Sequence, residues 1–180
     1  MSIEIGAPLN MSSTLRKQES YVELLALTRG LIDGERDWLA SLSNFSALVF
    51  SQVPDLNWAG FYVARDGELV LGPFQGKVAC IRIPFERGVC GACARTGEAQ
   101  IVPDVHQFEG HIACDAASRS ELVVPLMRGE ELLGVFDLDS PIPARFDIDD
   151  AQGIAKAIAH LAQGTNWLEP VPILKRLLKD

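Results

Sequence analysis

The sequence predicts a single α+β domain in which helices pack on one antiparallel sheet. Three observations favour this class. Helical periodicity dominates the first third of the chain, short strand-like segments with turn signals between them fill the middle, and a further helical stripe closes it. A length of 180 residues suits one domain with a substantial buried core.

The N-terminal third is helical in pattern over residues 15–53. Within it an apolar stripe recurs at the spacing of one helix face, formed by Trp38, Leu42, Phe45 and Val49. Two glycines, Gly30 and Gly34, predict a break between this helix and an earlier one around Tyr21–Thr28.

From Asn57 onward the pattern changes to that of strands. Residues Asp66 and Gly67 form a hairpin turn signal between two such segments. The elements expected here are, in order, strands at Trp58–Ala64, Glu68–Phe74 and Cys80–Pro84, a short helix over residues 88–97 that ends at Gly97, and a strand at Gln100–Val102.

Residues 103–120 show neither a helical nor a strand period, and a long irregular segment inside a compact domain is often a lid or binding loop. A second hairpin is expected from Glu121–Met127 and Leu132–Asp139. Asp147 and Asp150 then predict the start of the closing helix, which carries the apolar stripe Ile154, Ile158 and Leu161.

Charge and composition exclude several function classes. The net charge is −8 and the pI about 4.9, which argues against a general nucleic-acid or anionic-membrane surface, since both need clustered Lys and Arg. No stretch approaches a membrane span, and the N-terminus lacks the pattern of a signal peptide. Four cysteines are too few for a disulfide-built secreted scaffold, so a reducing cytoplasm is the expected compartment.

The four cysteines, Cys80, Cys90, Cys93 and Cys114, allow three interpretations. Cys90-x-x-Cys93 followed by His111-x-x-Cys114 comes close to the spacing of a zinc site. Cysteines in a cytosolic protein are also often small core residues, and this interpretation suits Cys93. Cys114 lies in the irregular segment, where reactive groups are most often placed. The residues alone leave metal ligand, core residue and nucleophile all open.

Carboxylates inside a strand pattern are the second unusual feature. Period-2 alternation sends Asp137 and Asp139 to the same face, and Glu121 on the partner strand of the hairpin is within reach of that face. One interpretation is an ordinary exposed sheet face. The other is a concave acidic site, whose carboxylates would raise one another's pKa values or require a cation such as an ammonium group or a metal.

Aromatic residues in the first strand offer an apolar surface. Trp58 and Tyr62 are four residues apart and share a face of the strand, with Gly60 between them. They are either ordinary core or an apolar box for a small ligand group.

Four motifs, in this order, resemble the free methionine-(R)-sulfoxide reductases, which are stand-alone GAF-domain enzymes. They are NWAGFY, GPFQGKVACIRIPFERGVCG, DVHQFEGHIACDAASRSELVVP and GVFDLDS. The resemblance runs from about Ser20 to about Leu161, and four motifs in register are far more specific than any one alone. It implies a GAF fold, with an antiparallel sheet flanked by N-terminal and C-terminal helices.

The resemblance also implies an activity and residue roles. The reaction is reduction of free methionine R-sulfoxide to methionine, usually with thioredoxin as electron donor and without a cofactor or metal. Cys114 matches the nucleophile, Cys80 the resolving thiol and Cys90 a thiol used in regeneration. The residues matching those that hold the substrate are Trp58, Tyr62, Glu121, Asp137 and Asp139. Cys93 has no counterpart in the family pattern. Because it forms a Cys-x-x-Cys pair with Cys90, the order in which the thiols exchange during regeneration stays open.

Three parts of the chain are expected: an N-terminal extension at residues 1–19, taken to be flexible, a GAF domain at 20–164, and a tail at 165–180 that forms a short amphipathic helix. Family members are commonly dimers, so a homodimer is a further expectation. The alternative function is a sensory GAF module that binds a small ligand without catalysis.

Overall fold

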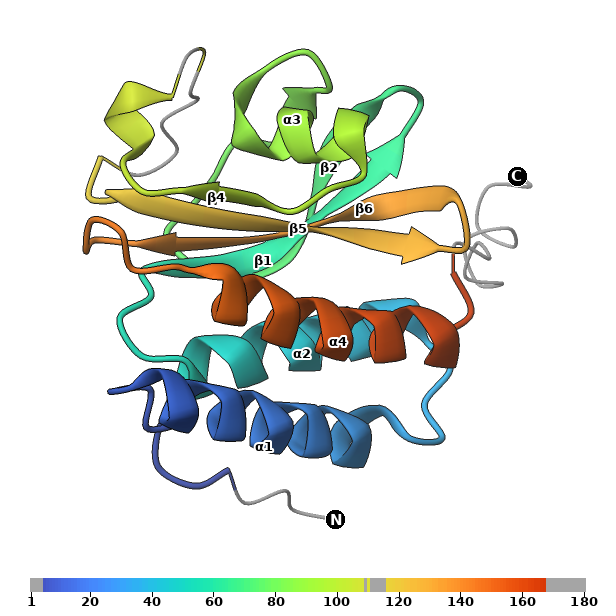
Figure 1. Ribbon diagram of the computed structural model, residues 1–180. Coiled ribbons are helices and arrows are strands. Elements are labelled where there is room, and N and C mark those ends of the chain that lie inside the picture. The colour runs from blue at the N-terminus through green and yellow to red at the C-terminus, as the bar shows by residue number, and fades with distance from the viewer. Residues whose placement is uncertain (1–4, 109, 111–115, 168–180) are drawn as a thin grey trace.

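The computed structural model describes residues 5–108, 110 and 116–167. A six-stranded antiparallel sheet forms its middle layer, in the order β3-β2-β1-β6-β5-β4. Figure 1 shows α2 and α4 packed on one face of this sheet, with α1 packed on them from outside, and α3 on the other face. The α+β class and the antiparallel sheet with N-terminal and C-terminal helices are therefore confirmed.

The helices are α1 (Thr14–Ile32), α2 (Trp38–Gln52), α3 (Gly88–Thr96) and α4 (Ile148–Gly164), with a 3-10 turn at Val105–Gln107. The strands are β1 (Trp58–Arg65), β2 (Glu68–Gly76), β3 (Arg82–Pro84), β4 (Gln100–Val102), β5 (Ser120–Arg128) and β6 (Glu131–Ser140). Among the described helices, none is both long and apolar enough to cross a membrane.

The first helix differs from its prediction at both ends. It begins at Thr14, capped by the Ser13 side chain, and it continues through Gly30 to Ile32. The predicted break between two helices is confirmed, but it lies after Ile32 and not at Gly30, since one glycine costs a helix only about 1 kcal/mol and the packing of α1 offsets this. Gly34, with φ +90°, lies in the turn that follows.

Part of the expected N-terminal extension is built into the fold. Leu9 is buried, and its backbone N–H donates to the Gln52 carbonyl at 2.9 Å. Lys17 forms ion pairs with Asp147 at 2.8 Å and with Asp150 at 2.7 Å, and so joins α1 to the start of α4. Residues 168–180, which include the predicted amphipathic tail helix, lie outside the described residues.

The later elements follow the sequence pattern closely. Asp147 and Asp150 form the capping box that starts α4, and Gly97 ends α3 in the left-handed conformation, both as expected. The strand predicted at Cys80–Pro84 is shorter, because only Arg82–Pro84 pair with β2. Cys80 therefore lies in the loop between β2 and β3.

Two apolar clusters lie on opposite faces of the sheet. The larger one packs β1, β5 and β6 against α1, α2 and α4, and it includes Leu42, Phe45 and Val49 of the predicted stripe. The smaller one lies between the sheet and α3 and contains Trp58, Tyr62, Cys90 and Cys93. The smaller cluster is where the candidate site residues gather.

Candidate functional site

Three carboxylates come together on the sheet face that α3 covers. The strand register places Glu121 directly opposite Asp139, and Asp137 lies two residues along β6 on the same face. On the other side of β6, Trp58 is opposite Asp139 and Gly60 is opposite Asp137. Alternation alone predicted that these side chains share a face, and the structure agrees.

All three carboxylates are buried. Glu121 is 6%, Asp137 7% and Asp139 9% exposed. The interpretation as an ordinary solvent-exposed sheet face is therefore wrong. The physical reason is α3, which packs over β5 and β6 and removes this part of the sheet from solvent.

Cys90 reaches the carboxylates from above the sheet. It is the third residue of α3, and its Sγ atom lies 4.0 Å from Glu121 Oε1. The start of α3 packs closely against the backbone of Pro84 and Phe85 because Gly91 has no side chain. A Cβ at Gly91 would lie 2.6 Å from the Phe85 carbonyl oxygen and 2.8 Å from that of Pro84. One ligand atom each from Cys90, Glu121 and Asp137 lies within 4.8 Å of the others.

Burial shifts the acid–base properties of this group. It raises the pKa of Glu121 well above the usual carboxyl range, and the charges of Asp137 and Asp139 raise it further. The pKa of Asp137 is raised as well, first by burial and then by the charge of Asp139. The pKa of the Cys90 thiol is also raised, first by burial and then by the charge of Asp137. A carboxyl group of this cluster therefore retains a proton at a pH where an exposed one has lost it.

One atom of this cluster has no partner of its own. Within the described part of the chain, Asp137 Oδ1 is buried and has no hydrogen-bond partner. An unpaired buried carboxylate oxygen is costly, so the site is better satisfied when a donor or a cation from outside occupies it.

Aromatic rings line the neighbouring strands. The Trp58 ring stacks on Tyr62 with centroids 5.9 Å apart and on Phe74 of β2 at 5.4 Å. Trp58 Nε1 donates to the Lys77 carbonyl at 3.1 Å, which ties the indole to the loop that carries Cys80. Phe74 was not singled out from the sequence, because it reaches Trp58 only through the β1–β2 register.

The remaining cysteines fall in different environments. Cys80 is half-buried and packs against the smaller apolar cluster. Cys93 is fully buried, and burial raises the pKa of its thiol, in agreement with a core role. Cys114, the predicted nucleophile, and His111 of the zinc interpretation lie outside the described residues.

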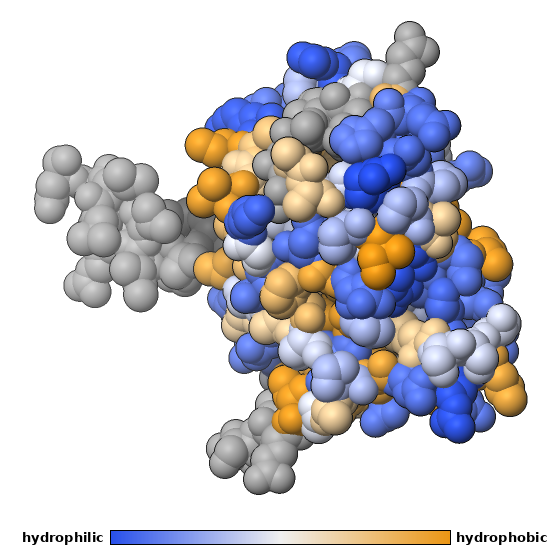
Figure 2. Space-filling model, turned by 90° about the vertical axis from the view of Figure 1, so that its left-hand side faces the viewer, coloured by the Kyte–Doolittle hydropathy of each residue, from blue (hydrophilic) through white to orange (hydrophobic). Residues whose placement is uncertain are grey.

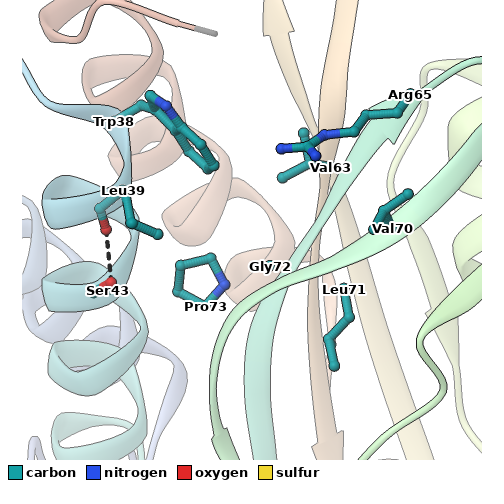
Figure 3. Close-up of a pocket in the computed structure, with 9 residues that line it drawn as sticks. All are labelled: Trp38, Leu39, Ser43, Val63, Arg65, Val70, Leu71, Gly72 and Pro73. Carbon is teal, nitrogen blue, oxygen red and sulfur yellow. Dashed lines mark hydrogen bonds between the residues drawn. The ribbon is translucent and has the colours of Figure 1, made fainter. Parts of the chain in front are cut away.

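A pocket of about 370 Å³ lies on the opposite face of the sheet, between α2 and the β1–β2 hairpin (Figure 3). Its lining residues are Trp38, Leu39, Ser43, Val63, Arg65, Val70, Leu71, Gly72 and Pro73. None of the predicted site residues that the structure describes is among them. Figure 2 views the end of the sheet where β5 begins and β6 ends, and apolar residues there are scattered among polar ones.

Comparison with known proteins gives a consistent result. Residues 40–163 match the GAF domain family. A free methionine-R-sulfoxide reductase from Escherichia coli is 49% identical over 147 residues, 82% of this chain and 89% of that protein. One from Saccharomyces cerevisiae is 47% identical, over 82% of this chain and 87% of its own length.

A solved structure shows the same likeness in three dimensions. The free methionine-R-sulfoxide reductase from Neisseria meningitidis, determined in complex with its substrate, superposes with a TM-score of 0.81 at 39% identity. The match covers 88% of this chain and 93% of that one.

Proposed function

Because the chain belongs to the GAF-domain family and, within it, to the free methionine-R-sulfoxide reductases, we propose that it reduces free L-methionine (R)-S-oxide to L-methionine. The observation that carries the proposal is the buried group of Glu121, Asp137 and Asp139 beside the stacked Trp58 and Tyr62 rings. A free amino acid sulfoxide has groups that suit both: an ammonium and a polar S–O bond for the carboxylates, and a methyl group for the rings.

The proposed chemistry uses thiols and one carboxyl proton. The Cys114 thiolate attacks the sulfoxide sulfur while an acid protonates the oxygen, methionine leaves, and a sulfenic acid remains on Cys114. Cys80 then condenses with the sulfenic acid to form a disulfide and release water. Two thiols are thereby oxidised to one disulfide as the sulfoxide is reduced to the thioether.

The raised pKa values of Glu121 and Asp137 support the acid step. A general acid works best when its pKa lies near the working pH, and an ordinary carboxyl group is too acidic for that. Burial beneath α3 keeps at least one proton in the cluster, available to the sulfoxide oxygen.

Regeneration requires an external dithiol, for which we propose thioredoxin. Cys80 lies in a loop and is half-buried, whereas Cys90 is buried. A thiol exchange from the Cys80–Cys114 disulfide to Cys90, followed by attack of thioredoxin, would return the enzyme to its reduced form. No cofactor is needed for this cycle, and the reducing cytoplasm is the compartment in which it would run.

A steady-state assay tests the reaction. NADPH consumption coupled through thioredoxin and thioredoxin reductase is followed with the free R epimer, the free S epimer and a peptide containing methionine sulfoxide. We expect turnover of the free R epimer only, abolished in Cys114→Ser and retained in Cys93→Ser. Activity that survives Cys114→Ser would refute the nucleophile assignment. A sensory module would bind the ligand and return it unchanged.

Selectivity for the free amino acid follows from the acidic group, since a methionine inside a polypeptide has no α-ammonium. Removing one partner of a buried charged contact costs about 2 kcal/mol or more, so Asp137→Asn or Asp139→Asn should lower kcat/KM for the free substrate at least ~30-fold. Asp66→Asn, in the exposed turn between β1 and β2, is the control. Full turnover in both site variants would disprove the acidic group as the basis of selectivity.

A further inference from the structure

The buried group formed by Cys90, Glu121 and Asp137 has the composition of a metal site. One thiol and two carboxylates contribute ligand atoms that lie within 4.8 Å of one another. The three residues come from three elements, α3, β5 and β6, and all are at least nine-tenths buried. Exposed acidic clusters are common without an ion, whereas Asp and Glu side chains are seldom fully buried unless they are paired.

Asp137 supplies a second, independent observation. Its Oδ1 atom is buried and has no hydrogen-bond partner in the described part of the chain. Among the described residues, no Lys or Arg side chain forms an ion pair with Asp137 either, so no basic side chain there competes with a cation for this carboxyl group. A cation from solution would satisfy this oxygen directly.

We propose that Cys90, Glu121 and Asp137 bind Zn²⁺. Zinc accepts thiolate and carboxylate ligands together, whereas Mg²⁺ and Ca²⁺ take oxygen ligands. With bond lengths of ~2.3 Å to sulfur and ~2.0–2.2 Å to oxygen, tetrahedral coordination places two ligand atoms ~3.5 Å apart. The 4.0 Å between Cys90 Sγ and Glu121 Oε1 therefore needs to close by about half an ångström.

The ion would have three protein ligands and a fourth, open position for water or an anion. Binding displaces the protons that burial retains on the cluster, so the affinity for zinc rises with pH. The inference goes beyond the proposed function: the ion is an exchangeable inhibitor and not a cofactor. It occupies Glu121 and Asp137, the carboxylates proposed to hold the free amino acid, and so competes with the substrate.

The ligand set is tested with the full chain, reduced by a phosphine so that no small thiol competes for metal. Co²⁺ serves as a spectroscopic probe, because a bound thiolate gives a charge-transfer band, and zinc affinity is measured by competition with a chromophoric chelator. Cys90→Ala is compared with Cys93→Ala, one helical turn away and also buried.

We expect the charge-transfer band in the wild type and in Cys93→Ala, and its loss in Cys90→Ala. Asp137→Asn and Glu121→Gln, which keep the side-chain shape, should weaken zinc binding at least about tenfold, a loss that even an outer-shell change produces. A band that persists in Cys90→Ala, equal losses in both alanine variants, or unchanged zinc affinity in both carboxylate variants would overturn the proposal.

Competition between zinc and free methionine sulfoxide tests whether the metal site overlaps the substrate site. Free methionine sulfoxide should weaken zinc binding, and zinc bound as tightly in its presence as in its absence would overturn the inhibitory role. The binding measurements need no turnover, so the zinc site can stand if the reductase proposal fails, and the reductase can stand if zinc does not bind.

Discussion

Asp137 shows how far a single position can be predicted. Alternation in β6 and the hairpin with β5 predict that it shares a face with Asp139 and lies near Glu121, and the register confirms both. The depth of its burial could not be predicted, because the covering helix α3 reaches this face only in the folded chain. The sequence offered raised pKa values through mutual repulsion as one of two interpretations, but their largest cause, burial, could not be predicted from it.

Asp137→Asn should stabilise the protein at neutral pH while it weakens activity. The pKa of Asp137 is higher in the folded protein than the value of ~3.9 in the unfolded chain. The contribution of the protonated Asp137 to folding stability is therefore fully present below pH ~3.9, and it is lost as the pH rises through the folded-state pKa. Asparagine cannot ionise and avoids this loss. We expect a gain of about 1–2 kcal/mol at pH 7 that shrinks toward pH 4, measured by urea unfolding across that range.

The matched control for this prediction is Asp66→Asn, in the exposed turn between β1 and β2. Unfolding curves for Asp137→Asn that run parallel to those of the wild type at every pH would mean that Asp137 does not hold a shifted proton in the folded protein.

At the scale of elements, the β1–β2 pair positions the aromatic wall. Gly60 allows β2 and the Trp58 ring to approach: a Cβ at this position would collide with Phe74 and lie 2.7 Å from Trp58 Cη2. The sequence placed Gly60 between Trp58 and Tyr62 on the strand, but the contact with Phe74 depends on the register between strands. The sequence pattern of each segment predicts the strand itself, whereas side-chain contacts between neighbouring strands can be identified only once the strand register is known.

Gly60→Ala should therefore destabilise the protein by about 1–3 kcal/mol, the usual cost of overpacking. It should also raise KM for the free substrate, because the displaced Trp58 and Phe74 rings no longer form the wall. Both effects can be measured by thermal unfolding and steady-state kinetics.

Gly30→Ala is the control of opposite sign. An added Cβ there has no neighbour within 4 Å, and alanine favours the interior of α1 by about 0.5–1 kcal/mol. If both substitutions change stability in the same direction, the close approach at Gly60 does not constrain the wall.

For the whole molecule, the order of helices and strands predicted the architecture because each segment carries its own periodicity. Residues 14–19 were misjudged because their role depends on a partner about 130 positions away: Lys17 is buried by its ion pairs with Asp147 and Asp150. The expected homodimer concerns a second copy of the chain and stays a prediction, which light scattering of the purified protein would test.

The central claim is that this chain itself reduces free methionine R-sulfoxide with its own thiols. The most direct test mixes the fully reduced protein with the free R epimer in the absence of any recycling reductant, and then counts methionine and remaining thiols. We predict about one methionine released per chain, with two thiols lost for each, and no methionine from the S epimer. The absence of methionine, or its release without loss of thiols, would contradict the account.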